Sequence, residues 1–299
     1  MSRARPPEPS EAAAREMGDR LSPALYITAT PIGNRGDVTL RGLEVLKLAD
    51  RVLCEDTRVT RKLLGLYGLS RQLVAYHDHN ADAMRPQVLG WLAAGMAVAL
   101  VSDAGTPLIS DPGFKLVRDC RAAGLAVTAV PGASALLSAL AVAGQPTDRF
   151  FFLGFLAAKS AARRTQLAEV AGVRSTLVVY ESPRRLAGLL ADAAAMLPGR
   201  EAVVCRELTK MFEETVAMPL PDLAAHYAGA ETPKGEVVVV IGPPSDAALA
   251  WSDARIDAAL RDALAVHSVK DAAALVASAS GVAKKSLYSR AMELREADR

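Results

Sequence analysis

Short apolar runs alternate with amphipathic stretches from Leu25 onward. The apolar runs are rich in Val, Leu and Ile and predict five strands, at Leu25–Ala29, Arg51–Glu55, Leu73–Tyr76, Val98–Ser102 and Ala126–Val130. Stretches with helical spacing follow them, at Thr39–Ala49, Arg58–Leu66, Asp82–Ala94, Gly113–Ala123 and Ser134–Ala143. Strands joined by helices of this length predict βαβ crossovers, and therefore a parallel sheet with helices on its faces.

A second block begins after Gly144-Gln145-Pro146-Thr147, which we interpret as a hinge. Its predicted strands are Arg149–Gly154, Thr176–Tyr180, Glu201–Glu207, Glu213–Val216 and Glu236–Ile241, with helices at Ala161–Ala171, Arg184–Leu197 and Leu220–Tyr227. The strands around Cys205 and Thr215 leave no room for a crossover helix between them. They should therefore be antiparallel, which makes the second sheet mixed.

The remainder of the chain, after Gly242-Pro243-Pro244-Ser245, predicts short helices only, at Asp253–Ala265, Ser268–Ser278 and Lys284–Glu296. Ser268 has the position of an N-cap, with Asp271 three residues later. The predicted organisation is an α/β protein with a tail at 1–22, a parallel-sheet domain at 23–144, a mixed-sheet domain at 145–243 and a helical region at 244–299. The tail is rich in proline and charge and lacks the apolar segment of a signal peptide, so we expect it to be disordered.

Composition excludes some classes of protein but does not indicate a function. The 299 residues hold 35 Lys and Arg against 33 Asp and Glu, a formal charge of +2, so no global positive field indicates a nucleic-acid binder. The three cysteines form no CxxC pair, and no apolar stretch reaches the length of a membrane span. We therefore expect a cytoplasmic protein with reduced thiols.

The candidate chemistry lies in the loops that follow the five strands of the first block. These loops carry small, polar or ionisable residues: Thr30-Pro31-Ile32-Gly33-Asn34, Glu55-Asp56-Thr57-Arg58, His77-Asp78-His79-Asn80, Ser102–Gly113 and Pro131-Gly132-Ala133-Ser134. Loops at the opposite edge, such as Gly68-Leu69-Ser70, are bland. Ligands of open parallel sheets bind outside the carboxyl ends of the strands, so this asymmetry predicts an active site there.

Each loop also has a plainer interpretation. Glycine and proline in such loops are common turn residues, and Ser134 could be only an N-cap. His77 and His79 could suggest a metal, but two residues apart at a strand end they rarely converge on one ion without further ligands, so no metal is expected. Glu55-Asp56 could be a surface pair near Arg58, and the basic clusters could be solvated helix faces.

Two common phosphate-binding motifs are absent from the sequence. No GxGxxG follows the first strand, and no GxxxxGK[ST] occurs anywhere, so neither a dinucleotide fingerprint nor a P-loop is present. The acidic-x-Gly-x-Gly-x-Gly loop of common Rossmann-type methyltransferases is absent too. From the residues alone, the prediction ends at a two-domain α/β enzyme with an unidentified ligand.

Taken together, the ordered strings resemble the ribosomal RNA small subunit methyltransferase I family, within the tetrapyrrole (corrin/porphyrin) methylase superfamily. The strings that carry the resemblance are those of the five loops together with Tyr180-Glu181-Ser182, Arg206-Glu207-Leu208-Thr209-Lys210, Lys234-Gly235-Glu236 and, in the helical region, Gly281–Ser289. The resemblance implies S-adenosylmethionine in a cleft between two α/β domains, a homodimer, and 2′-O-methylation of a cytidine ribose in 16S rRNA of the small ribosomal subunit, at the decoding centre. By the same resemblance the cofactor would be bound by Pro31, Ile32, Gly33, Gly105, Thr106, Pro107, Ile109, Pro131, Gly132, Ser134, Ala135, Tyr180, Lys234 and Gly235.

Such a reaction needs a base, because a ribose 2′-hydroxyl is a poor nucleophile until its proton is removed. The ionisable groups in the appropriate loops are Asp56, His79 and Glu181, and no metal is required. We favour Asp56, whose pKa we expect to be raised by desolvation in a closed cleft. For RNA, we expect phosphate contacts from a local set of basic residues at the cleft mouth: Arg58, Arg61, Lys159, Arg163, Arg164, Arg184 and Arg185.

Two other functions stay open at this point. A methyltransferase acting on a small tetrapyrrole or corrin would share the fold and the cofactor, although the Glu-Asp-Thr-Arg and His-Asp-His-Asn strings and the helical region argue against it. A non-enzymatic RNA-binding protein would tolerate the same basic clusters but would show no turnover.

Overall fold

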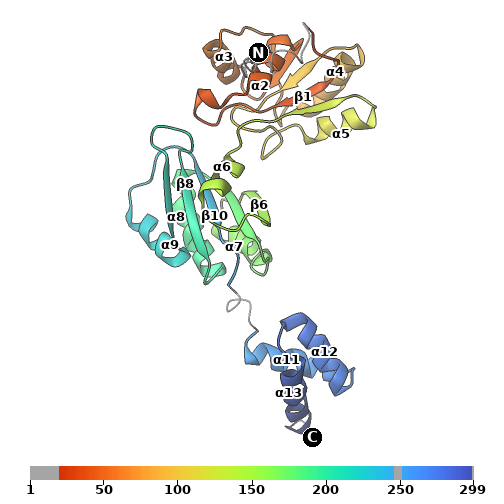
Figure 1. Cartoon of the computed structure of the whole chain (residues 1–299), viewed down its shortest axis with the longest axis vertical. Coiled ribbons are helices and arrows are strands. Elements are labelled where there is room, and N and C mark those ends of the chain that lie inside the picture. The colour runs from red at the N-terminus through yellow and green to blue at the C-terminus, as the bar shows by residue number, and fades with distance from the viewer. Residues whose placement is uncertain (1–19, 246–250, 298–299) are drawn as a thin grey trace, which may run out of the picture.

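Two five-stranded sheets and a helical bundle make up the protein, for which we use a computed structural model that describes residues 20–245 and 251–297 (Figure 1). The predicted tail lies almost entirely outside these ranges. Leu21, which the sequence analysis placed in the tail, is buried in the core of the first sheet.

The first sheet is parallel, as predicted, with the strand order β3-β2-β4-β1-β5. Its strands are β1 (Leu25–Thr28), β2 (Arg51–Cys54), β3 (Leu73–Ala75), β4 (Val98–Leu100) and β5 (Val127–Val130), followed in turn by α2 (Leu40–Leu48), α3 (Thr57–Leu66), α4 (Ala81–Ala93), α5 (Phe114–Ala122) and α6 (Ala135–Val142), with a short 3-10 turn η1 (Arg35–Asp37) before α2. Successive side chains of a strand point to opposite faces, so Tyr26, Val52 and Ala99 enter one core while Leu25, Leu53 and Val98 enter another. Both faces of this sheet are therefore covered, which agrees with its near-continuous apolar strands.

The second sheet is mixed, with the order β6-β7-β10-β8-β9. Its strands are β6 (Phe150–Phe155), β7 (Thr176–Glu181), β8 (Glu201–Arg206), β9 (Glu214–Pro219) and β10 (Val237–Ile241), with helices α7 (Ser160–Glu169), α8 (Pro183–Met196) and α9 (Leu220–Gly229). Cys205 pairs with Thr215 in the antiparallel β8–β9 ladder, which confirms the predicted antiparallel direction of these two strands. The all-Val/Ile strand β10 lies at the centre of this sheet and is buried throughout.

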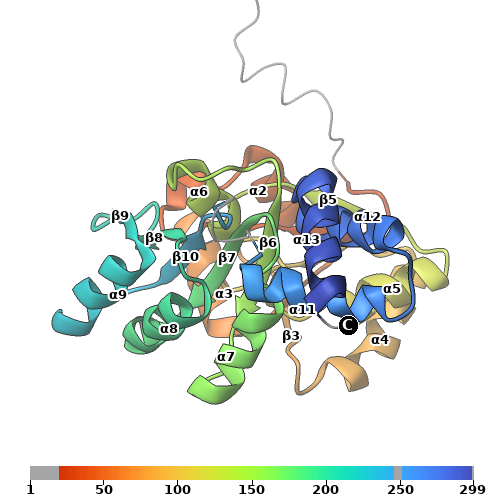
Figure 2. The ribbon, with the colours of Figure 1, turned by 90° about the horizontal axis from the view of Figure 1, so that it is seen from below.

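Helix α6 belongs by packing to the second sheet, although it follows the last strand of the first. Leu136, Ala139 and Leu140 enter a core with Val178 and Val240. Figure 2 shows α6 on one face of the second sheet, with α7, α8 and α9 on the other. The chain therefore passes between the two sheets at residues 131–134, earlier than the predicted boundary at Gly144 and Gln145. The sequence placed the boundary at the Gly-Pro break because an apolar helix does not reveal which sheet it will cover.

The C-terminal helices α11 (Asp253–Leu264), α12 (Val269–Ser280) and α13 (Lys284–Ala297) pack on one another around their own apolar core (Figure 1). The Ser268 hydroxyl accepts a hydrogen bond from the Asp271 backbone N–H, as predicted for the N-cap of α12. Gly281 ends that helix with φ 73°, the left-handed conformation typical of a glycine C-cap. Within the described ranges, no helix is both long and apolar enough to cross a bilayer.

Candidate active site

A cavity of about 390 Å³ lies where the carboxyl-end loops of the first sheet meet the second sheet. Ile32, Asp103–Thr106 and Ile109–Asp111 line it from the first sheet, and Ser134 and Ala135 line it from the start of α6. The second sheet contributes Phe155, Glu181–Pro183 with Tyr180, Cys205, Leu208 and Gly235–Val238. The predicted location of the active site at this edge is thus matched by a cavity of the size that binds small ligands and cofactors.

The loop between β4 and α5 forms one wall with an unusual backbone. Leu108 (φ 74°) and Ser110 (φ 66°) are both in the left-handed region, where side-chain-bearing residues are strained. Gly113 has φ 132°, and a Cβ there would lie 2.8 Å from the Leu100 side chain. From the opposite side, Gly154 (φ 62°) lets the β6 backbone approach the Ser110 hydroxyl closely. Packing from both sheets therefore holds this loop in place.

Carboxyl groups gather at the same edge. Glu55 follows β2, while Asp103 and Asp111 lie in the β4–α5 loop. Burial raises the pKa of Asp111 to about 6, and the negative charges of Glu55 and Asp103 add to the rise while the Ser102 hydroxyl opposes it. Burial, with Asp103 and Asp78, also raises the pKa of Glu55. Because burial and neighbouring like charges both disfavour ionisation, Asp111 at this edge can exchange a proton near neutral pH.

Tyr180 ties the second sheet to α6 across the cavity. Its hydroxyl accepts a hydrogen bond of 3.0 Å from the Leu136 backbone N–H, one of the unsatisfied donors in the first turn of α6. The Tyr180 ring packs edge-on against Phe152 and Phe155, and burial raises its pKa. The Ser134 hydroxyl caps the same helix by accepting from the Leu137 N–H. The N-cap interpretation of Ser134 is thus correct, although Ser134 also lines the cavity.

A second connection joins the two sheets through the loop after β8. The Lys210 ammonium contacts the carboxylates of Glu207 (2.6 Å) and Glu236 (2.8 Å), while its aliphatic chain lies over Gly33. Thr209 accepts a hydrogen bond of 3.1 Å from the Asn34 backbone N–H. These contacts hold the loop after β1 against the second sheet beside the cavity.

Comparisons with known proteins agree with this architecture. A family model described as Tetrapyrrole (Corrin/Porphyrin) Methylases matches residues 24–224, and one described as RsmI C-terminal HTH domain matches residues 251–295. Ribosomal RNA small subunit methyltransferase I of Mesorhizobium japonicum is 49% identical over 92% of this chain and 94% of its own length. The protein of the same name from Erythrobacter litoralis is 50% identical, over 92% of this chain and 96% of its own.

This chain belongs to the ribosomal RNA small subunit methyltransferase I family. The resemblance inferred from the loop strings is therefore confirmed. Among solved structures, a uroporphyrin-III C-methyltransferase from Thermus thermophilus complexed with S-adenosylhomocysteine is similar with a TM-score of 0.51. That similarity covers 73% of this chain and 97% of the other, and at 21% identity it supports the fold alone.

The residues predicted to bind the cofactor fall into two groups in the structure. Those that line the cavity are Ile32, Gly105, Thr106, Ile109, Ser134, Ala135, Tyr180 and Gly235. Those outside its lining are Pro31, Gly33, Pro107, Pro131, Gly132 and Lys234. Of the second group, Gly33 lies under Lys210, and a Cβ on Gly132 would lie 2.9 Å from the Cβ of Ala29, so close packing explains both glycines. The first group remains our prediction for cofactor contact.

Several lining residues have no role in the sequence analysis. Asp103 and Asp111 lie in the loop after β4, at the carboxyl edge of the first sheet, and this position in the sequence is the signal that could identify them as site residues. Leu208 also lines the cavity, and it lies in one of the strings that carry the family resemblance. Cys205 and Phe155 reach the cavity from the second sheet, and nothing in their sequence context distinguishes them from core residues.

The preferred catalytic candidate, Asp56, is wrongly interpreted in the sequence analysis. Its carboxylate caps α3 by accepting from the Arg58 backbone N–H (2.8 Å) and forms an ion pair of 2.7 Å with the Arg58 guanidinium. These contacts lower the pKa of Asp56 to about 2, whereas we expected desolvation to raise it. A carboxylate with so low a pKa is a weak base, and Asp56 does not line the cavity.

The other two catalytic candidates differ in position. His79 is exposed in the β3–α4 loop and lies outside the cavity lining. Glu181 lines the cavity with its side chain fully buried. One Glu181 oxygen accepts from the Ser182 backbone N–H (2.7 Å), and the other lies 3.1 Å from the Arg185 guanidinium. Both oxygens of the buried Glu181 side chain are thus already engaged by the protein.

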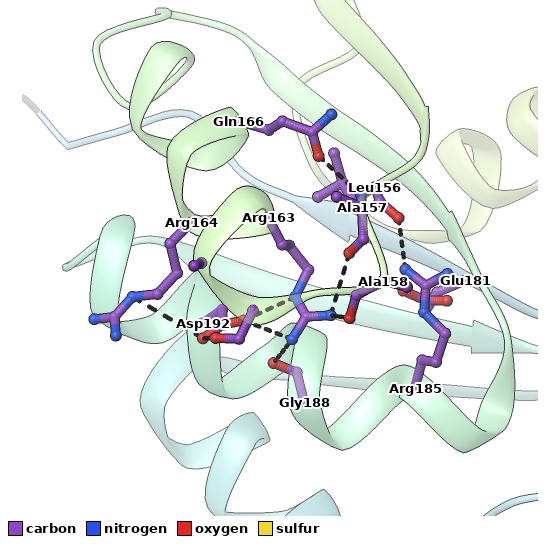
Figure 3. A network of polar contacts seen from close by, with 12 residues as sticks. Leu156, Ala157, Ala158, Arg163, Arg164, Gln166, Glu181, Arg185, Gly188 and Asp192 are labelled. Carbon is purple, nitrogen blue, oxygen red and sulfur yellow. Dashed lines mark hydrogen bonds and ion pairs between the residues drawn. The ribbon is translucent and has the colours of Figure 1, made fainter.

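One of the predicted RNA contacts is wrong. Arg163 is only 5% exposed, and its guanidinium forms an ion pair of 2.5 Å with Asp192 (Figure 3). It also donates to the carbonyls of Ala158 (3.3 Å) and Gly188 (3.1 Å). Arg163 therefore joins α7 to α8 inside the fold and cannot reach a phosphate. Residues adjacent in the sequence of a helix point in different directions around its axis, because there are about 3.6 residues per turn. A cluster of basic residues in the sequence therefore does not distinguish the buried Arg163 from its exposed neighbour.

Arg185 is also engaged by the protein, through the Leu156 carbonyl (2.5 Å) and Glu181 (Figure 3). The remaining predicted RNA contacts, Arg58, Arg61, Lys159, Arg164 and Arg184, are exposed. They stay candidates for phosphate contact.

Arg163 and Arg164 form a matched pair for a stability test. We expect Arg163→Ala to lower the free energy of unfolding by about 3–5 kcal/mol, because it leaves Asp192 buried without its partner. Arg164→Ala, with a side chain that is 50% exposed and 4.0 Å from Asp192, should change it by no more than about 0.5 kcal/mol. Urea unfolding followed by circular dichroism measures both. Equal effects of the two substitutions would contradict this assignment.

Proposed function

We propose that this protein transfers the methyl group of S-adenosylmethionine to the 2′-hydroxyl of a cytidine ribose in 16S rRNA, at the decoding centre. The observation that carries the proposal is the cavity between the two sheets, in a chain that belongs to the ribosomal RNA small subunit methyltransferase I family along nearly its whole length. The reaction is a displacement at a methyl carbon, for which alignment of donor and acceptor supplies much of the acceleration.

The lining of the cavity fits such a donor. S-adenosylmethionine combines a flat aromatic base and a hydroxyl-bearing sugar with a positively charged sulfur and a polar amino acid end. The cavity offers apolar walls from Ile32, Phe155, Leu208 and Val238, together with carboxyl groups of Asp103 and Asp111 that complement positive charge. When bound, the donor supplies an electrophilic methyl group.

The residues of the chain have three tasks in this mechanism. The loop after β4, held by contacts from both sheets, provides the wall against which ligands are oriented. Leu208 and Tyr180 close the cavity from the second sheet and reduce access of water, which strengthens electrostatic interactions inside. A carboxylate near the acceptor must take up the proton of the ribose hydroxyl.

A labelling experiment tests the proposed reaction. The full chain is incubated with a radiolabelled methyl donor and, in parallel, with small ribosomal subunits lacking the modification, free 16S rRNA, or a free corrinoid. We expect label in a cytidine ribose of the ribosomal substrate, located by nuclease digestion and mass spectrometry. Label in the corrinoid would favour a small-molecule methyltransferase, and label in no substrate would favour a non-enzymatic RNA-binding protein.

We further propose that exposed basic residues around the cavity contact rRNA phosphates. Arg184 directly follows the lining residue Pro183, and Arg61 lies one turn after the start of α3. The double substitution Arg61→Gln and Arg184→Gln should weaken RNA binding and reduce the slope of log K against log salt by about 1.5, since each phosphate contact contributes roughly 0.7–0.9.

Fluorescence anisotropy with an rRNA fragment at several salt concentrations measures that slope, and calorimetry with S-adenosylhomocysteine should show unchanged affinity. The matched control is Arg121→Gln with Arg174→Gln, which removes the same charge from exposed positions outside the cavity lining. An equal loss in both double variants would contradict a local RNA-binding surface.

We also propose that the protein is a homodimer that works in the cytoplasm, where its rRNA substrate is assembled. The edge strand β6 leaves Phe150 and Phe151 more than 40% exposed, and α6 leaves Leu137 and Val142 exposed beside the same sheet. Unpaired apolar edges of this kind are usually covered.

Sedimentation velocity should give twice the mass of one chain, and Phe150→Ser with Phe151→Ser should shift the protein toward the monomer. A monomeric wild-type protein at micromolar concentration would refute this assignment.

A further inference from the structure

Four carboxylate side chains line the cavity, and their partners differ. Glu181 is paired with Arg185 and Glu236 with Lys210. Asp103 accepts a hydrogen bond of 3.2 Å from the Asp56 backbone N–H. Among the residues that the structure describes, no Lys, Arg or His forms an ion pair with the remaining carboxylate, Asp111.

The position of Asp111 is set by the strained β4–α5 loop. It directly follows Ser110, which has a left-handed backbone and a hydroxyl that packs close to Gly154 of β6. It lies two residues before Gly113, which has no room for a side chain. Asp111 therefore lies at the wall of the cavity between two tightly packed points, and its side chain is partly rather than fully buried. Strained backbone of this kind persists only where the surrounding packing enforces it.

We infer that Asp111 is the catalytic base that accepts the proton of the ribose 2′-hydroxyl. The inference rests on the proposed function and adds a residue to it. Asp111 has the properties that Asp56 lacks: it lines the cavity, it is not neutralised by a guanidinium, and it stands among Glu55, Asp103 and Asp78 rather than beside Arg58.

The proton and electron balance of the step is simple. The 2′-oxygen forms a bond to the methyl carbon as the bond between that carbon and sulfur breaks, and its electron pair remains on sulfur, which becomes neutral. The hydroxyl proton passes to the Asp111 carboxylate and from there to water. No oxidant, reductant or metal takes part.

The groups around Asp111 predict how this step depends on pH. The acidic side chains that act on it are Glu55 after β2, Asp78 after β3 and Asp103 after β4, and Tyr180 faces it from β7. Burial and these charges raise the pKa of Asp111 to about 6, so the carboxylate is largely deprotonated at pH 7.5 and largely protonated at pH 5. Activity should therefore rise with pH through about 6, with a slope of one on a logarithmic plot.

The test uses the full-length chain with Asp111→Asn and, as a second variant that removes only a neighbouring charge, Asp103→Asn from the same loop. We expect Asp111→Asn to lower kcat for methyl transfer by about 10²- to 10⁴-fold and to remove the rise of the remaining activity near pH 6. The dissociation constant for S-adenosylhomocysteine, measured by calorimetry, should change less than threefold. Asp103→Asn should retain the dependence on pH, with its midpoint moved to lower pH because a neighbouring negative charge is lost.

Folding is checked independently of activity. The raised pKa of Asp111 means that the folded protein binds its proton more tightly than the unfolded chain, so the contribution of this group to stability is lost as pH rises from about 4 to 6. At pH 7.5 the Asp111→Asn protein should therefore be at least as stable to heat as the wild type. A clear loss of thermal stability would mean that Asp111 has a structural role and would overturn the inference.

The other outcomes separate this inference from the proposed function. If the wild-type protein methylates rRNA and Asp111→Asn does so at a similar rate with the same dependence on pH, Asp111 is not the base. If Asp111→Asn loses affinity for S-adenosylhomocysteine by the same factor as kcat/KM, the residue is a cofactor ligand and the inference is wrong. If the wild-type protein itself transfers no methyl group to rRNA, the proposed function has failed, and the inference fails with it.

Discussion

The packing of α6 against the second sheet is the constraint on which the site depends. The helix is covalently joined to β5 of the first sheet, yet its apolar side chains are buried with Val178 and Val240 of the second. This arrangement holds the carboxyl edge of the first sheet opposite the carboxyl end of β7 and the beginning of β10. The cavity lies between those edges, and its two walls would separate if the helix left the apolar core. Burial of apolar surface, at roughly 25 cal/mol per Å², thus fixes the relative position of the loops that line the cavity.

Hydrogen bonds and ion pairs between the two sheets add a preferred geometry to the apolar packing of α6. Lys210, held between two carboxylates, covers Gly33, and the Tyr180 hydroxyl accepts from the first turn of α6. Apolar packing alone tolerates small sliding movements, whereas a hydrogen bond loses most of its strength when its geometry is disturbed. Together, the apolar packing and these hydrogen bonds hold loops from two sheets in the fixed relative position that a displacement reaction between two ligands requires.

The sequence predicts the strands and the parallel and mixed sheets, because these follow from the spacing of apolar residues. It also predicts the edge at which the cavity lies, because polar and ionisable residues gather in the loops after the strands of the first sheet. It does not predict the roles of individual charged residues. Asp56 and Asp111 are both acidic residues in carboxyl-end loops, but Arg58 lowers the pKa of the first and burial raises that of the second. Arg163 and Arg164 are neighbours in sequence, yet one is inside the fold and the other outside. Such differences depend on the direction of each side chain, which local patterns do not specify.

The distribution of charge resolves an apparent conflict between a near-neutral chain and an RNA substrate. Acidic side chains, Asp103 and Asp111 among them, line the cavity, where they would attract a cationic sulfur donor, while exposed guanidinium groups such as Arg58 and Arg184 lie outside the lining. Opposite charges so arranged nearly cancel in the total of +2, but at close range each acts on its own ligand because screening limits its reach to about 8 Å at physiological salt. A uniformly basic surface would bind RNA more tightly but would also repel the donor from the cavity. The local separation of charge is therefore better suited than net charge to a reaction that brings a cation and a polyanion together.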